Sequence, residues 1–175
     1  MASGAVPAAL VAAGAPPGDG RHLTRIELPD ASPLPSPYAE ADRRQAVADL
    51  LAGNRFDPAG VAHHGPFALH LMVRDGRLIL DIRDADGDAP LRALVLALGP
   101  FRRLIKDYHL IVESHECAVT EGGHEARIQA IDMGRRGLHN EGAELLAERL
   151  RGRVALDFET ARRLFTLVCA LHQRI

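Results

Sequence analysis

The stretch Phe67–Ile82, FALHLMVRDGRLILDI, decides the fold of this chain. Apolar and polar side chains alternate in both of its halves, as they do in a half-buried β-strand. An Asp-Gly pair at 75–76 suits a two-residue type I′ turn, which places Leu71 opposite Leu80. In that register the alternating apolar side chains all lie on one face. We therefore predict a β-hairpin over residues 67–83.

The other face of this hairpin is polar. In the predicted register His70 lies directly opposite Asp81. Side chains that face each other across two strands are close enough to interact. We therefore expect His70 and Asp81 to form a cross-strand polar pair.

The segments around the hairpin are mostly helical in pattern. Before it, we expect a strand over 22–28 and a helix over 38–52, with a loop over 54–66. After it, apolar residues recur mainly at helical spacing, and glycines or prolines separate the runs. The chain is therefore predicted to be α+β, with a small antiparallel sheet that contains the hairpin, packed against a C-terminal bundle of about four helices. The expected C-terminal elements are helices over 91–98, 100–121, 124–151 and 157–171, with a short strand over 153–156.

Composition indicates one domain over residues 21–175, preceded by an Ala/Gly/Pro-rich tail over 1–20 that we expect to be disordered. The tail lacks the basic residues of a secretory signal or a transit peptide. No apolar run approaches the roughly 20 residues that span a bilayer. Two cysteines, Cys117 and Cys169, suit a reducing compartment. We therefore expect a cytoplasmic protein without a membrane partner.

The segment 131–142, IDMGRRGLHNEG, is unusual because it places three glycines inside a predicted helix. Each interior glycine costs about 1 kcal/mol relative to alanine, so some packing should offset the cost. At 100° per residue, one face collects small and apolar residues, and another element could approach its glycines closely. An alternative is that the helix breaks near Gly137 and that Asn140 caps a second helix. The residues of this seam are Ile131, Gly134, Leu138, Gly142 and Leu145.

Polar residues cluster on the adjoining face of the same segment. Asp132 and Arg136 are four residues apart and can pair, as can Arg135 and His139. One interpretation is a solvated, salt-bridged surface. The other is an anion site, in which two guanidinium groups bind the anion and a histidine transfers protons. The candidate residues for binding an anion or a partner are Asp132, Arg135, Arg136, His139, Asn140 and Glu141.

A second cationic cluster, Arg102, Arg103 and Lys106, lies on one face of the helix predicted over 100–121. It could join Arg135 and Arg136 in a local basic patch. The formal charge of the whole chain is only −2, and aromatic residues make up 4% of it. A nucleic-acid partner is therefore an alternative that the composition does not favour.

Motifs for metals, nucleotides and nucleophiles are missing from the sequence. The alternating Glu113, His115 and Cys117 point in opposite directions on a helix, so they do not form a metal site. There is no phosphate-binding loop and no Gly-x-Ser-x-Gly motif. Cys169 lies among apolar residues and suits packing. We predict no metal and no cofactor, and the sequence leaves open whether the protein is an enzyme.

Three longer stretches point to a family. IDMGRRGLHNEG at 131–142, DFETARRLFTLVCALH at 157–172 and RRLIKDY at 102–108 resemble an uncharacterised bacterial protein family, number 0262 of the UPF series. The resemblance extends from about Arg21 onward. It implies no activity, cofactor or site residue.

Two hypotheses of function follow from these patterns. The first is a non-catalytic module that binds a protein, or RNA, through its arginine-bearing helix faces. The alternative is a small enzyme or ligand sensor with an anion site on the Asp132–His139 face. A concave site at this face would favour the alternative.

Overall fold

The computed structural model describes residues 10–11 and 19–172. Most of the predicted tail over 1–20 lies outside the described residues, but Leu10–Val11 forms a short strand. The helices are α1 (Pro37–Ala52), α2 (Arg102–Thr120), α3 (Glu125–Leu150) and α4 (Phe158–Leu171), with a short 3-10 helix η1 (Gly99–Phe101). The strands are β1 (Leu10–Val11), β2 (Leu23–Glu27), β3 (Phe56–Pro58), β4 (Phe67–Arg74), β5 (Arg77–Asp84), β6 (Pro90–Ala97) and β7 (Val154–Leu156).

The predicted hairpin is β4–β5. Leu71 pairs with Leu80, as the turn requires. Asp75 and Gly76 have φ of 50° and 69°, the left-handed backbone that a type I′ turn needs at both central positions. The hairpin and its register are therefore confirmed.

The polar pair expected on this hairpin is wrong. His70 and Asp81 do face each other in the register. However, His70 Nε2 lies 3.1 Å from Glu27 Oε2 on the neighbouring strand β2, and Asp81 accepts a hydrogen bond from Arg83 at 2.9 Å. The neighbouring strand offered a closer partner, which the hairpin alone did not reveal.

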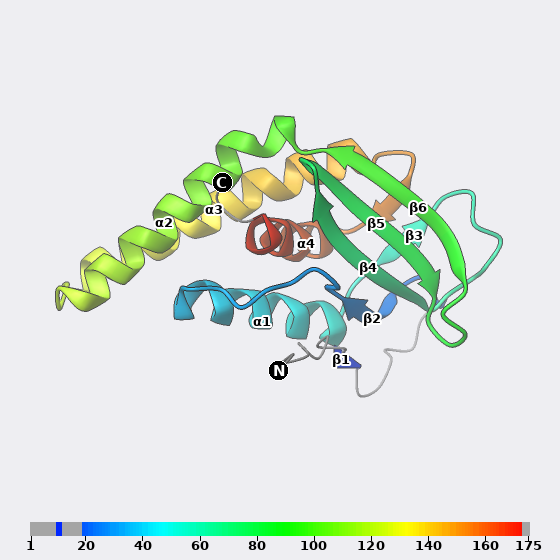
Figure 1. Ribbon diagram of the computed structural model, residues 1–175, viewed down its shortest axis with the longest axis horizontal. Helices are drawn as coiled ribbons and strands as arrows, with labels where there is room; N and C mark the ends of the chain where they lie inside the picture. The colour runs from blue at the N-terminus through cyan, green and yellow to red at the C-terminus, as the bar shows by residue number, and fades with distance from the viewer. Residues whose placement is uncertain (1–9, 12–18, 173–175) are drawn as a thin grey trace, which may run out of the picture.

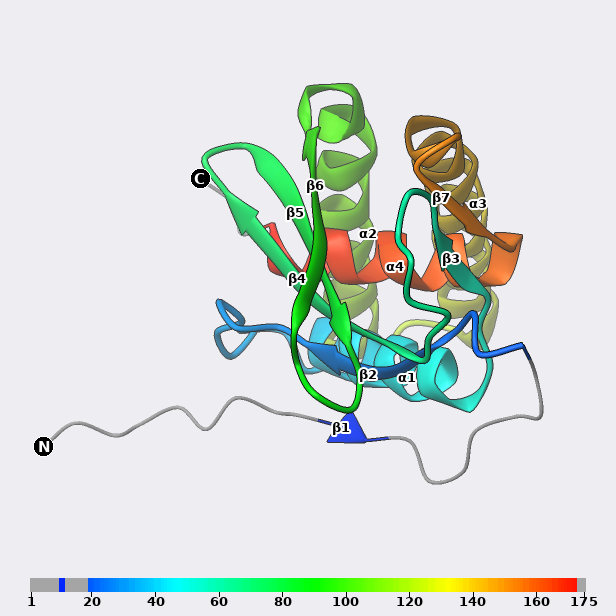
Figure 2. The same ribbon diagram turned by 90° about the vertical axis from the view of Figure 1, so that its right-hand side faces the viewer.

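The larger sheet has the order β1-β2-β4-β5-β6. The predicted α+β class is confirmed, but the sheet is mixed because β2 runs parallel to β4. Parallel neighbours need a long crossover, and α1 supplies it by lying between the two strands in the chain. All four helices lie on one side of this sheet (Figures 1 and 2).

The helix expected over 91–98 is wrong, because residues 91–97 belong to strand β6. β6 pairs antiparallel with β5, and Leu94 and Leu96 face the core while Val95 is 50% exposed. Short apolar runs do not distinguish a helix from a strand by periodicity, and this run is rich in leucine and alanine. Pairing with β5 decides its conformation.

A second, two-stranded sheet joins distant parts of the chain. β3, inside the segment expected to be a loop, pairs antiparallel with β7. The short strand expected over 153–156 is confirmed by β7. The β3–β7 ribbon places the first residues of α4 beside the end of α1. Asp157 caps α4, because its side chain accepts a hydrogen bond from the Thr160 backbone N–H at 2.8 Å.

The alternative of a break near Gly137 is wrong, because α3 is one continuous helix. α2 and α3 lie side by side as a helical hairpin whose turn extends beyond α1 and α4 (Figure 1). α4 lies in the centre of the molecule, and most of its residues are buried. No helix of the described part combines the length and the apolar character needed to cross a membrane.

Candidate functional site

Arg135 lies where α1 meets α3. Its guanidinium donates to Asp42 Oδ1 of α1 at 2.8 Å and to Asp132 Oδ1 at 2.8 Å. The Tyr38 ring lies over it, with the guanidinium carbon 5.9 Å from the ring centre. Tyr38 in turn stacks on His115 of α2 at 3.9 Å, so one arginine connects three helices.

Asp42 receives further polar groups from the interior. Tyr108 of α2 donates its hydroxyl proton to Asp42 Oδ2 at 3.0 Å. His139 Nε2 lies 3.8 Å from the same oxygen and has no hydrogen-bond partner among the described residues. His139 is only 2% exposed. We call Asp42, Tyr108, Asp132, Arg135 and His139 the Asp42 cluster.

Burial sets the protonation of this cluster. It lowers the pKa of His139 to about 3, and the nearby Arg135 acts in the same direction. His139 is therefore neutral near pH 7, and its approach to Asp42 is not an ion pair. Burial also raises the pKa of Asp42 against the opposing effect of Arg135, and it raises the pKa of Tyr108. The hydrogen bond from Arg135 lowers the pKa of Asp132.

The charges leave little attraction for an external anion. Arg135 is the cation of the Asp42 cluster, and it already contacts two carboxylates. An anion arriving at Arg135 would compete with Asp42 and Asp132, whose positions are fixed by the helices. The cluster therefore acts as a polar connection between α1, α2 and α3.

The remaining predicted residues of α3 point elsewhere. Arg136 is exposed and pairs with Asp132, as expected, at 3.1 Å. Asn140 is exposed. Glu141 pairs with Arg103 of α2. The six candidate residues therefore divide between the interior connection and the surface of the helix.

The predicted basic patch also divides. Arg103 pairs with Asp107 at 3.1 Å and with Glu141, so it joins α2 to α3. Arg102 and Lys106 instead line a cavity of about 340 Å³ on the other side of α2. Because Arg103, Arg135 and Arg136 are all paired with carboxylates, they do not form one open cationic surface with Arg102 and Lys106.

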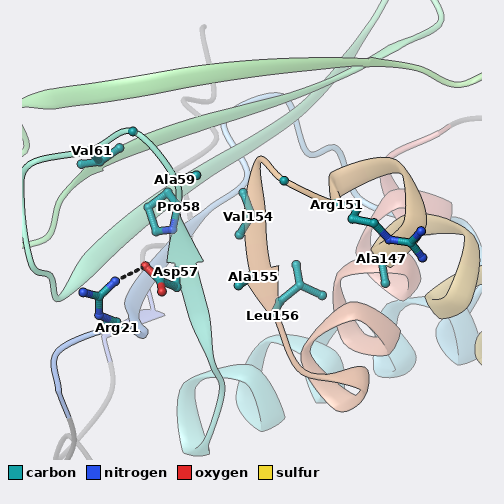
Figure 3. A pocket seen from close by; sticks show the side chains of 12 residues that line it. Arg21, Asp57, Pro58, Ala59, Val61, Ala147, Arg151, Val154, Ala155 and Leu156 are labelled. Carbon is teal, nitrogen blue, oxygen red and sulfur yellow. Dashed lines mark hydrogen bonds and ion pairs between the residues drawn. The ribbon is translucent and has the colours of Figure 1, made fainter.

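A separate cavity of about 500 Å³ lies beside the β3–β7 ribbon (Figure 3). Its charged residues do not converge. Arg21 is bonded to Asp57 at 2.6 Å, and the Arg151 side chain extends away from the ribbon (Figure 3). The cavity thus offers apolar contact without groups for chemistry. Its small and apolar lining includes Pro58, Ala59, Val61, Ala147, Val154 and Leu156.

The three glycines of α3 differ in their surroundings. A Cβ atom added to Gly142 would lie 2.3 Å from the Phe165 ring of α4, so the predicted close approach is confirmed there. At Gly134 the nearest atom, Ile111 Cδ1, is 3.9 Å away, which leaves room for alanine. Around a Cβ atom added to Gly137, no described atom outside the adjacent residues and the local helix backbone lies within 4 Å. The close approach expected at Gly134 is therefore wrong.

The exposed face of α3 carries a stripe of small and apolar residues. Ala126, Ala130, Met133 and Gly137 are exposed and follow one another at intervals of four, three and four residues. This is the spacing of a helix–helix seam. Met133 is 71% exposed. We call these four residues the α3 stripe.

Sequence reasoning missed Asp42, Tyr38 and the cavity beside Arg102. Asp42 lies among charged and small residues of α1, where nothing distinguishes it from a solvated carboxylate. Tyr108 ends the quoted stretch RRLIKDY, in which nothing indicates that its hydroxyl group reaches Asp42. Only the packing of α1 and α3 on α2 and α4 brings these groups to Arg135.

Comparison with known proteins settles the relationship. The model of an uncharacterised protein family, UPF0262, matches residues 20–174. This chain belongs to that family. A UPF0262 protein of Granulibacter bethesdensis is 59% identical over 90% of this chain and 87% of its own length. Others from Acidiphilium cryptum and Maricaulis maris are 62% and 54% identical, over 79% and 87% of this chain and 84% and 94% of their own lengths.

Membership in UPF0262 confirms the resemblance of the three quoted stretches. It transfers no activity, since the descriptions of the family and of these relatives name none. No solved structure matches this chain. The function must therefore be argued from the geometry.

Proposed function

We propose that this protein is a non-catalytic protein-interaction module, which docks a helix of a partner protein along the α3 stripe. The observation that carries the proposal is the half of α3 over 125–137. None of its residues is buried, although it continues a helix whose other half is packed into the core.

Helix propensity makes this exposed half unfavourable by itself. Gly134 and Gly137 each cost about 1 kcal/mol relative to alanine. At Gly142 the contact with Phe165 requires a glycine. At Gly137 no described part of the chain makes such a demand. A partner helix lying against Gly137 would provide one, because small residues let two helices approach closely.

The stripe also indicates what the partner helix presents. Met133 projects between the small residues Ala130 and Gly137, so large apolar side chains of a partner would fit on either side of it. Arg136 borders the stripe and is 64% exposed. It pairs with Asp132 at 3.1 Å, so an acidic residue on the partner helix would have to share it with Asp132. Arg136 thus adds a charged contact at the edge of the α3 stripe, and the apolar contact along the stripe supplies most of the binding free energy.

Other assignments have less support. An anion site at Asp132–His139 would need Arg135 to leave two carboxylates. Binding of nucleic acid would need open cationic surface, while Arg103, Arg135 and Arg136 are paired. We also propose a cytoplasmic location, which agrees with two cysteines that form no disulfide, Cys117 exposed and Cys169 buried.

A photo-crosslinking amino acid at position 133, introduced into the full chain in its native host, tests the proposal. We expect one discrete adduct, whose partner is identified by mass spectrometry and then purified. The purified partner should bind the wild-type chain at one to one, and Met133→Glu should abolish binding while circular dichroism stays unchanged. The same crosslinker at Arg44, exposed on α1, is the control and should give no such adduct.

Two results would overturn the proposal. One is equal binding of the partner by the wild-type chain and by Met133→Glu. The other is an adduct of twice the mass of this chain, which would show that the stripe serves self-association.

A further inference from the structure

The cavity beside Arg102 lies between the turn of the β4–β5 hairpin, the beginning of α2 and the end of α4. Its volume is about 340 Å³, within the range of small-molecule sites. It is separate from the α3 stripe and does not depend on the function proposed above. Its side chains are the apolar Leu98 and Ile105 and the cationic or polar Arg102, Lys106, His109 and His172.

Among the described residues that line this cavity, two are cationic and none is a carboxylate. Arg102 and Lys106 are one helical turn apart on α2, and within residues 19–172 neither takes part in an ion pair. Arg103, next in the chain, is paired with both Asp107 and Glu141. Arg102 and Lys106 are both exposed, and within the described residues they lack the counter-charge that the neighbouring Arg103 has.

Two histidines complete the polar side. His109 Nε2 donates to the backbone carbonyl of His172 at 3.0 Å, which ties α2 to the end of α4. His172 Nδ1 is buried and has no hydrogen-bond partner in the described part of the chain. A buried polar atom without a partner is unfavourable by about 1–3 kcal/mol.

We infer that this cavity binds a phosphate monoester with a small apolar organic part. The planar fork of Arg102 and the ammonium group of Lys106 suit phosphoryl oxygens. Leu98 and Ile105 form the wall against which the organic part would pack. A monocarboxylate would neutralise only one of the two cations.

Titration calorimetry of the full chain with phenyl phosphate, inorganic phosphate and benzoate tests this assignment. Phenyl phosphate should bind most tightly, and the backbone amides of residues 102–109 should shift in the NMR spectrum. The double variant Arg102→Gln with Lys106→Gln should weaken binding by at least about tenfold. Arg103→Gln, whose side chain lies outside the cavity, is the matched control and should change the affinity by less than about twofold.

Several results would overturn the inference. They are the absence of binding by phenyl phosphate, equal affinity of the double variant and the wild-type chain, and inorganic phosphate or benzoate binding as tightly as phenyl phosphate. A phosphoserine peptide serves as the test of a protein-borne phosphate. Tighter binding of that peptide than of phenyl phosphate would overturn the assignment to a small molecule.

Discussion

The two halves of α3 belong to one helix but are held in different ways. The half over 138–150 contains every buried residue of the helix, and it packs on α4 through Gly142. The half over 125–137 has none, and its two glycines have room around them. The difference shows that glycines inside one helix can have different structural roles. The neighbours of each glycine in space decide whether it is required by packing inside the chain.

The largest effect should come from filling the packed glycine. Gly142→Ala places a methyl group 2.3 Å from the Phe165 ring. Because both helices are fixed by the core, we expect the free energy of unfolding to fall by about 3 kcal/mol. Urea denaturation measures this change. A loss below about 1 kcal/mol would show that α3 and α4 separate easily, and the contrast between the two halves would weaken.

The Asp42 cluster lies at the boundary of the two halves, and its loss should rank second. Asp42→Ala leaves Tyr108 and Arg135 without a buried acceptor, so we expect a loss of about 2 to 3 kcal/mol of stability. Arg136→Ala removes an exposed partner of Asp132 and serves as the control, with an expected change below about 0.5 kcal/mol. Thermal and urea unfolding of Asp42→Ala and Arg136→Ala compare the interior contacts of Arg135 with the exposed ion pair of Arg136. Similar losses in both would contradict the assignment of Asp42 to the interior.

The buried His139 predicts a pH dependence of the packed half. Its pKa is about 3 in the folded protein, against 6.5 when exposed. The unfolded chain therefore binds more protons between these values, and stability falls as pH falls through this window. The raised pKa of Asp42 acts in the opposite sense at the acidic end.

The comparison with a variant isolates the contribution of His139. Between pH 7 and pH 4.5 the wild-type chain should lose about 2 kcal/mol more stability than His139→Gln. Urea denaturation at several pH values measures the difference. Parallel curves for the two proteins would mean that His139 becomes protonated in the folded state.

The smallest effect belongs to the open half. Gly137→Ala adds a methyl group that no described atom outside the adjacent residues and local helix backbone approaches within 4 Å, so stability should rise by about 0.5 to 1 kcal/mol. Gly134→Ala should act in the same direction. A destabilising result in the isolated protein would show that this half is packed after all, and it would remove the main support for a docking surface there.

Local chemistry allowed part of the fold to be predicted. The Asp-Gly turn and the alternation around it determine the β4–β5 register, because both act between residues close in the chain. The same holds for the ion pair between Asp132 and Arg136, one turn apart on α3. The α+β class followed from the count of such elements.

Tertiary structure decided what depends on distant residues. The segment 91–98 became β6 because β5 offered an edge, and β2 runs parallel to β4 because α1 crosses between them. Arg135 met Asp42, a residue 93 positions earlier. The contacts of Arg135 therefore depend on tertiary packing, and a binding role for the candidate residues of α3 stays a prediction. Turns, caps and helical spacing arise within a few residues, whereas burial and charge pairing arise only when separate elements pack.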